Sequence, residues 1–437
     1  MCKELLEAFF PSAPPIHKLH PHDEQQRTIN QPQSSITIEE LDVIVRKLPN
    51  RKAPGPDSIN GTIFKNYFAI RGNIFRTLIE KCINIGLFPA CWKEGKVVPV
   101  PKGNREKTYK YYRPITLLSV PGKCLEKIFI DRVLQQIKNN GVWQEQQYGF
   151  TPNKSTTHAL VDLTTFLIQI RKEKKHTIAI SLDITGAFDN ISHRKIIELM
   201  TEYGVDDNLI AFTRSYLTDR NATLQVGDAK GSKRIVRGCA QGSKCGPGLF
   251  LIAMNELLTI LQKENIKTFA YADDLLLTFS GQDIDLLAAQ ATTILRLVSC
   301  WGHDSGLHFN PKKTQAIIIR CKKKTKWPVI TMGSDILTES ENLKYLGVYI
   351  NKNLSWQPHI KQIKQKAQAA IGICRRAMGS SWGLPTYLRQ RIYKCIIIPI
   401  CTYAVPAWID AFNIKKNQDQ FRIIEHSTVR QDQESSK

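Results

Sequence analysis

The chain has 437 residues, a length typical of two or three domains. Apolar residues make up 42% and charged residues 23%, which excludes a wholly disordered chain and allows a sizeable packed core. Since no run of about 18 or more consecutive apolar residues occurs, the sequence predicts no membrane span. The eleven cysteines are scattered without a CxxC pair, so neither a disulfide framework nor a compact zinc site is expected.

The net charge of +22 is concentrated in two segments. Residues 311–327 carry seven basic residues and no acids, and residues 342–409 carry ten basic residues and no acids. An ordinary solubilising surface usually mixes both signs of charge. Long segments of one sign therefore favour a nucleic-acid partner over the alternative, an anionic membrane surface.

Taken in chain order, the pattern begins with residues 1–34, which are rich in proline and polar residues and predict a disordered or loose tail. Thr37 and Glu40 have the spacing of a capping box, which predicts a helix that ends before Pro49. Apolar periodicity then predicts helices at 74–85, 120–138, 284–302, 356–376 and 384–398, and strands at 96–101, 178–183, 267–279, 314–321 and 343–350. The fold class is therefore α+β: a small antiparallel sheet with helices, then a basic helical module.

Carboxylates are placed at the ends of the two clearest strands. Asp183 ends one apolar strand, and Asp273 and Asp274 lie between two others. Because side chains alternate along a strand, the two adjacent acids converge only in a turn, which predicts a β-hairpin whose tip faces the end of the strand carrying Asp183. Clustered carboxylates raise one another's pKa unless a cation such as Mg²⁺ compensates them. Two such ions about 3.5–4 Å apart suit phosphoryl transfer, whereas a simple Asp-Asp turn is the alternative.

Further segments accompany these acids in a fixed order along the chain. They are Trp92–Lys102, Tyr112–Ser119, Gln147–Thr156, Arg237–Gly248, Asn310–Thr314 and Leu343–Val348. Together with Tyr271-Ala272-Asp273-Asp274, they resemble the reverse transcriptases of non-long-terminal-repeat (LINE-type) retrotransposons, especially the arthropod Jockey-like and ribosomal-DNA-inserting groups. The resemblance runs from about residue 51 to 408.

The resemblance implies a right-hand polymerase with fingers and palm at 35–350, a basic helical thumb at 351–410 and a polar tail at 411–437. It implies a catalytic, metal-binding triad of Asp183, Asp273 and Asp274. Residues implied to bind the nucleotide are Lys102 and Arg113 at the triphosphate, Phe188 as a floor that excludes a 2′-hydroxyl, and Gln241 beside the sugar and templating base. Tyr345, Leu346 and Gly347 match the primer grip, which contacts the primer-template.

The implied activity is that of an RNA-directed DNA polymerase, in which the primer 3′-hydroxyl attacks the α-phosphate of a dNTP with two Mg²⁺ ions, or Mn²⁺ in their place. The implied partners are an RNA template, a DNA primer and dNTPs, with no membrane. Neither an endonuclease nor a ribonuclease H domain is expected in this chain, so the endonuclease would be supplied elsewhere. The expected location is nuclear, cytoplasmic or both.

Three alternatives compete with this interpretation. An RNA-templated RNA polymerase shares the palm chemistry, but the bulky Phe188 argues against it. An intron maturase shares the core, but the pattern of the thumb is Jockey-like. A catalytically decayed, transposon-derived nucleic-acid-binding protein is favoured by Ala240, which stands where the family usually has proline, and by the absence of an endonuclease; the three intact aspartates argue against it.

Overall fold

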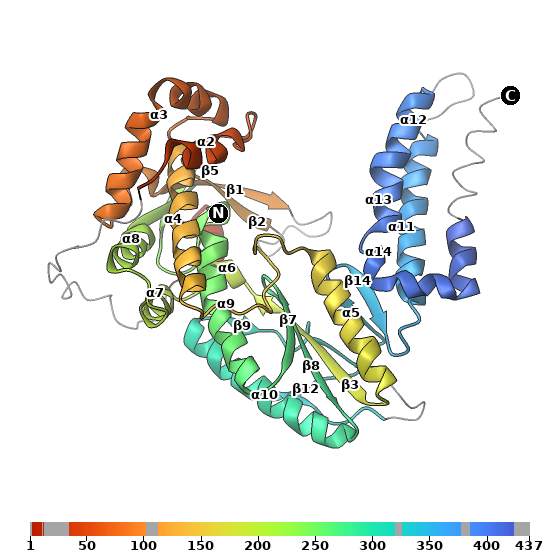
Figure 1. Cartoon of the computed structure of the whole chain (residues 1–437). Coiled ribbons are helices and arrows are strands. Elements are labelled where there is room, and N and C mark those ends of the chain that lie inside the picture. The colour runs from red at the N-terminus through yellow and green to blue at the C-terminus, as the bar shows by residue number, and fades with distance from the viewer. Residues whose placement is uncertain are drawn as a thin grey trace. The chain divides into compact units, whose positions relative to one another are not determined.

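The computed structural model describes residues 2–10, 12, 35–101, 112–319, 326–376 and 385–423 (Figure 1). The chain forms two compact units. The first combines residues 1–145, 184–260 and 300–308, and the second combines residues 146–183, 261–299 and 309–437. A four-stranded sheet lies in each unit, with strand order β2-β1-β5-β6 in the first and β10-β3-β8-β7 in the second. The expected α+β class is confirmed.

The sheet of the first unit is mixed. Its strands are β1 (Glu94–Pro101), β2 (Tyr112–Leu117), β5 (Arg220–Val226) and β6 (Ala229–Ile235). β1 pairs antiparallel with β2 and parallel with β5, while β5 and β6 form an antiparallel hairpin. Val97 of β1 and Leu224 of β5 are buried in the apolar core of this sheet.

The first ten residues differ from the loose tail expected for residues 1–34. Helix α1 (Cys2–Phe9) packs against β5 and β6 and buries Leu6 and Phe9 in the same core as Val97. An ion pair between Lys233 and Glu7 also joins the helix to β6. The physical reason is the apolar face of this short helix, which the proline-rich residues after it obscure in the sequence. Residues 13–34 lie outside the described residues.

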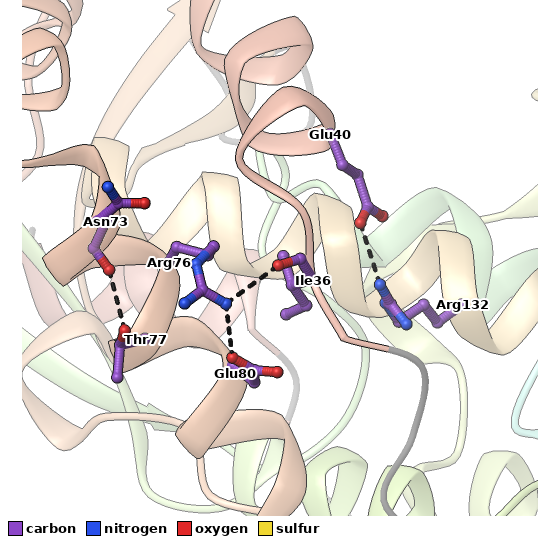
Figure 2. Close-up of polar contacts among 7 residues, drawn as sticks. All are labelled: Ile36, Glu40, Asn73, Arg76, Thr77, Glu80 and Arg132. Carbon is purple, nitrogen blue, oxygen red and sulfur yellow. Dashed lines mark hydrogen bonds and ion pairs between the residues drawn. The ribbon is translucent and has the colours of Figure 1, made fainter.

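Three helices of the first unit, α2 (Ile38–Arg46), α3 (Gly61–Asn84) and α4 (Val120–Asn139), are joined by polar contacts (Figure 2). Thr37 caps α2 by accepting a hydrogen bond from the Glu40 amide, as the spacing predicts. The Glu40 carboxylate pairs with Arg132 of α4 at 3.0 Å instead of closing the capping box. Arg76 of α3 donates to the carbonyl of Ile36, which joins α3 to the start of α2.

Among the remaining helices of the first unit, α7 is also capped by a side chain. Ser192 caps α7 by accepting from the Lys195 amide, and the Lys195 ammonium pairs with Glu256 on α9 at 2.8 Å. These helices are the 3₁₀ turn η2 (Ala90–Trp92), α6 (Ala187–Asn190), α7 (His193–Glu202), α8 (Asp207–Leu217) and α9 (Cys245–Lys263), of which the last three residues belong to the second unit.

The sheet of the second unit is antiparallel throughout, as expected. Its strands are β3 (His176–Leu182), β7 (Lys267–Tyr271), β8 (Asp274–Gly281) and β10 (Gln315–Ile319). β3 and β8 are apolar and buried along most of their lengths, because they are the two central strands. Helix α5 (Thr156–Lys172) packs against β3 and β7, and α10 (Ile284–Ser305) follows β8.

The basic C-terminal part is mostly helical over its described residues, 357–376 and 385–423. Trp408 is fully buried and stacks on Phe412 and Phe421. The expected boundary at 410 therefore differs from the structure, in which the packed region continues through a helix at 415–423. The elements are α11 (Gln357–Arg376), α12 (Thr386–Ile392), the π-helical η4 (Tyr393–Ile397), α13 (Ile398–Thr402), α14 (Val405–Trp408) and the 3₁₀ helix η5 (Ile409–Asn413).

The strand expected at 343–350 is interrupted by a turn. Leu346 and Gly347 both have positive φ, 45° and 83°, and they separate β13 (Asn342–Tyr345) from β14 (Val348–Asn351). The remaining short strands are β4 (Ile184–Thr185), β9 (His308–Phe309), β11 (Thr331–Met332) and β12 (Asp335–Ile336).

Two helices in the described part of the chain, α9 and α10, are long and apolar enough by composition to cross a membrane. A third candidate arises if the bent pair Gln390–Thr402 and Val405–Asn413 is counted as one span. The sequence contains no uninterrupted apolar run at these helices, because scattered polar residues break each one. Within α9, 72% of the apolar window is buried inside the protein, so its apolar residues belong to the core; the value for α10 is 39%.

Candidate active site

Asp183 lies immediately after the buried strand β3. Leu182, the last residue of β3, pairs with Leu275 of β8, so the register brings Asp183 to the end of the sheet at which β8 begins. The Asp183 carboxylate is 40% exposed, whereas the strand before it is buried. An apolar strand therefore carries this carboxylate to the edge of the core.

The predicted hairpin is confirmed, and its turn is two residues long. Tyr271 of β7 pairs with Asp274 of β8, which leaves Ala272 and Asp273 as the turn. Ala272 has a positive φ of 56°, a conformation that is uncommon for a residue with a Cβ atom. Because β3 pairs with β8, this turn and Asp183 lie at the same end of the sheet. The structure thus brings Asp183, Asp273 and Asp274 together.

The three carboxylates interact unfavourably. Partial burial raises the pKa of Asp273, and the negative charge of Asp183 raises it further. The pKa of Asp274 is also raised, first by loss of solvent around the carboxylate and then by repulsion from Asp273 and Asp183. Asp273 and Asp274 therefore resist ionisation, as expected for partly buried like charges brought close together.

Two lysines offset part of this negative charge. The Lys313 ammonium lies 3.6 Å from the Asp183 carboxylate, and the positive charge of Lys344 acts to lower the pKa of Asp274 against the larger effect of burial. The amide of Asn310 donates to the carbonyl of Asp183, which joins the segment before β10 to the end of β3. Lys313 belongs to the basic run at 311–327, so this run supplies a cation directly at the carboxylates.

The donor set suits a hard divalent cation, because carboxylate oxygens are the ligands that Mg²⁺ prefers and its charge would relieve the repulsion. Among the described residues, however, no three His, Cys, Asp or Glu side chains are grouped so that they could hold a metal ion as they stand. The three aspartates therefore provide the chemistry for metal binding, but their side chains are not preformed as a chelate.

Gln241, predicted to bind the nucleotide, lies in the first unit and is held from two sides. Its Nε2 donates to both carboxylate oxygens of Asp189 at 2.9 Å, and its carbonyl accepts from the Thr116 amide of β2 at 2.8 Å. The sequence did not predict this role for Asp189, because Gln241 lies 52 positions further along the chain.

Phe188 lies on the one-turn helix α6, and its ring centroid is 5.0 Å from that of the buried Phe250. Its carbonyl accepts from the Cys239 amide at 2.7 Å, so the glycine-rich segment 237–248 lies directly against α6. Gly238 is required for this approach, because a Cβ atom there would lie 2.3 Å from the carbonyl oxygen of Asp189. Phe188 and Gln241 therefore belong to one hydrogen-bonded assembly within the first unit.

Of the two basic residues predicted to grip the triphosphate, the structure describes only Arg113. Arg113 is exposed on β2, where it pairs with Val100 of β1. Its guanidinium is therefore carried by a strand that is paired in the sheet of the first unit. Lys102 lies outside the described residues, directly after β1.

The three residues predicted to form the primer grip are not presented alike. Tyr345 is buried, and its hydroxyl donates to the carbonyl of Phe269 at 3.1 Å. Its side chain therefore belongs to the core and is not presented to a nucleic acid. A buried tyrosine usually finds a hydrogen-bond partner for its hydroxyl, as Tyr345 does here. Leu346 and Gly347 form the partly exposed turn between β13 and β14.

The comparisons with known proteins agree with the geometry of the carboxylates. A family model described as reverse transcriptase (RNA-dependent DNA polymerase) matches residues 100–350, more than half of the chain, and this range includes all three aspartates. The chain belongs to this family.

Proteins of Drosophila melanogaster retrotransposons are similar over most of the chain. The chain is 28% identical to the putative 115 kDa protein of the type-1 retrotransposable element R1DM, over 86% of this chain and 36% of that protein. It is 26% identical to a probable RNA-directed DNA polymerase from transposon BS, over 91% and 45% of the two chains. It is 23% identical to the RNA-directed DNA polymerase of the mobile element jockey, over 91% and 44%. The resemblance to Jockey-like and R1-type elements is confirmed, and the chain spans less than half the length of these relatives.

Among solved structures, an apo telomerase from Candida tropicalis, truncated from its C-terminal domain, is similar over 61% of this chain and 54% of that one. The sequence identity is 12% and the TM-score is 0.43.

Proposed function

We propose that this chain is an RNA-directed DNA polymerase of a non-long-terminal-repeat retrotransposon, which extends a DNA primer on an RNA template with dNTPs. The observation that carries the proposal is the convergence of Asp183 with the Asp273-Asp274 turn at one end of an antiparallel sheet. The family match over residues 100–350 supports the same reaction.

The three aspartates are the residues that would hold Mg²⁺, or Mn²⁺ in its place. When bound, two such ions would activate the primer 3′-hydroxyl and neutralise the charge that develops on the triphosphate. The role of the chain itself is to bring three carboxylates together on a rigid turn and a strand end. Lys313 would have to leave the Asp183 carboxylate as the cation binds, which its exposed side chain permits.

The resemblance assigns the nucleotide contacts to the first unit. Arg113 offers a rigid guanidinium fork for phosphate, and Lys102 a mobile point charge. Phe188, supported by Phe250, would exclude a 2′-hydroxyl, and Gln241, held by Asp189, would pack beside the sugar.

For the primer grip, the burial of Tyr345 leaves the turn residues Leu346 and Gly347 as the contacts that we propose. We place the reaction in the nucleus, the cytoplasm or both.

Primer extension on an RNA template tests this function. The full chain is incubated with a DNA primer, dNTPs and Mg²⁺ or Mn²⁺, beside the variant Asp273→Asn and the matched control Asp335→Asn, which changes an acid on β12. We expect extension by the parent and the control, and a loss of at least about 100-fold in Asp273→Asn, because removing a charged ligand impairs metal-assisted transfer.

The result also decides between the proposal and a decayed nucleic-acid-binding remnant. The remnant would bind the primer-template in a salt-sensitive manner, and neither the parent nor any variant would extend it. Equal extension by the parent and Asp273→Asn would contradict the assignment of the site.

A further inference from the structure

Residues 146–149 run beside β7, the strand that leads into the catalytic turn. The amide of Ala270 donates to the carbonyl of Gln146 at 3.1 Å, and the amide of Tyr148 donates to the carbonyl of Ala270 at 2.8 Å. These residues belong to the second unit, as do β7 and the turn. The segment therefore covers the outer edge of β7 just before Ala272.

The side chain of Gln147 reaches the turn itself. Its Oε1 accepts one hydrogen bond from the Ala272 amide at 3.0 Å and another from the Gly149 amide at 2.8 Å. Because both partners are backbone donors, the atom that faces them must be the oxygen of the side-chain amide. Gln147 is 2% exposed, so water does not compete for these bonds.

Two features show how closely the turn is held. A Cβ atom on Gly149 would lie 2.2 Å from the nitrogen of Ala272, so only glycine permits this approach. Ala272 has a positive φ of 56°, and a strained conformation of this kind persists only where the surroundings enforce it. The Gln147 oxygen and the Gly149 backbone contact the peptide that carries this strain.

The buried side-chain amide of Gln147 also indicates that its oxygen is the group that matters. Its Nε2 is buried and has no hydrogen-bond partner among the described residues. A buried amide whose donor is unpaired destabilises the fold, so the group that the fold retains is the acceptor oxygen.

We propose that Gln147 is a positioning residue for nucleotidyl transfer. It holds the Ala272 peptide and thereby fixes the direction in which the next residue, Asp273, presents its carboxylate. The inference rests on the proposed function for its catalytic consequence, but the restraint on the turn is measurable without any activity.

Three variants of the full chain separate this role from ordinary packing. Gln147→Met keeps the length of the side chain and removes the acceptor, whereas Gln147→Glu keeps an oxygen in its place. The control is Asn255→Leu in the first unit, which removes another amide that is 2% exposed. Asn255 accepts from the Gln144 amide at 2.8 Å and donates to the carbonyl of Val142 at 2.9 Å, so the control loses comparable bonds that do not involve the turn.

Hydrogen exchange of residues 270–275, followed by mass spectrometry, measures the restraint directly. We expect exchange at least about tenfold faster in Gln147→Met than in the parent, slow exchange restored in Gln147→Glu, and no change in Asn255→Leu. Unchanged exchange in Gln147→Met, or an equal acceleration in Asn255→Leu, would overturn the proposal whether or not the chain polymerises.

Single-turnover extension then measures the catalytic consequence. We expect Gln147→Met to lower the maximal rate about 10- to 100-fold while the Kd for primer-template stays within about threefold of the parent. A normal rate in Gln147→Met, despite faster exchange, would overturn the catalytic role of the restraint. An inactive parent would contradict the proposed function instead, and the exchange measurement would still decide whether Gln147 holds the turn.

Discussion

Ala272 and Asp273 are the only residues between β7 and β8, so the pairing of these two strands fixes the backbone that carries the Asp273 carboxylate. Asp183 differs, because it follows a strand end and its carboxylate is 40% exposed beside Lys313. The positions of the two carboxylates should therefore respond differently to nearby substitutions. A change in the turn moves Asp273 through the backbone, whereas a change near Asp183 acts mainly through charge.

Phe188 is the residue that we expect to discriminate between dNTPs and ribonucleotides. Its ring is supported by Phe250 at 5.0 Å, and its backbone is held by the Cys239 amide. If Phe188 excludes the 2′-hydroxyl sterically, Phe188→Ala will lower the preference for dNTPs over ribonucleotides by at least about tenfold, whereas Phe188→Tyr will retain it. The ratio of kcat/KM for the two nucleotides checks this. An unchanged ratio in Phe188→Ala would remove the steric assignment.

At the scale of elements, helix α11 contains a buried histidine that makes stability depend on pH. His359 is 3% exposed, its ring lies edge-on to Trp408, and neither ring nitrogen has a hydrogen-bond partner among the described residues. Burial, and secondarily the charge of Lys366, lowers the pKa of His359 to about 4. The folded chain therefore takes up this proton at lower pH than the unfolded chain does.

The consequence is a loss of stability in acid. The contribution of neutral His359 is present above the unfolded pKa of about 6.5 and is lost as the pH falls through the folded pKa of about 4. The total loss is about 3 kcal/mol. The free energy of unfolding, measured against pH for the parent and His359→Leu, tests this. We expect the parent to lose more stability than the variant between about pH 6.5 and 4. Parallel curves would show that His359 does not titrate in this way.

The elements show what sequence periodicity can and cannot predict. The hairpin at 267–281 was predictable because two apolar strands flank an acidic pair, and α10 and α11 were predictable from their period. Helix α1 was missed because its apolar face precedes a proline-rich stretch. The turn at Leu346 and Gly347 was missed because apolar residues continue through it.

Some residues of the candidate site could likewise be predicted from the sequence, and others could not. The three aspartates could be predicted, because each lies next to an apolar strand whose end is visible in the sequence. The roles of Asp189 and Gln147 could not, since their partners lie 52 and 125 positions away in the chain. Only the fold brings those side chains to Gln241 and Ala272.

At the scale of the whole molecule, the net charge of +22 predicts that binding to nucleic acid weakens steeply with salt. Lys361 and Lys366 are exposed on α11, within the segment 342–409 that carries no acids. Each substitution to Gln that removes a phosphate contact should reduce the slope of log K against log salt by roughly 0.7 to 0.9. The control Lys263→Gln, on α9, should leave it unchanged. A flat salt response in the parent would contradict duplex binding by this segment.

The measurement that tests the catalytic centre most directly is the incorporation of a single deoxynucleotide on an RNA template as Mg²⁺ is titrated, for the parent and Asp183→Asn. We expect incorporation by the parent that depends on Mg²⁺, and a loss of at least about 100-fold in the variant at every concentration. Incorporation by Asp183→Asn at the rate of the parent would contradict the assignment of the carboxylates as the catalytic centre.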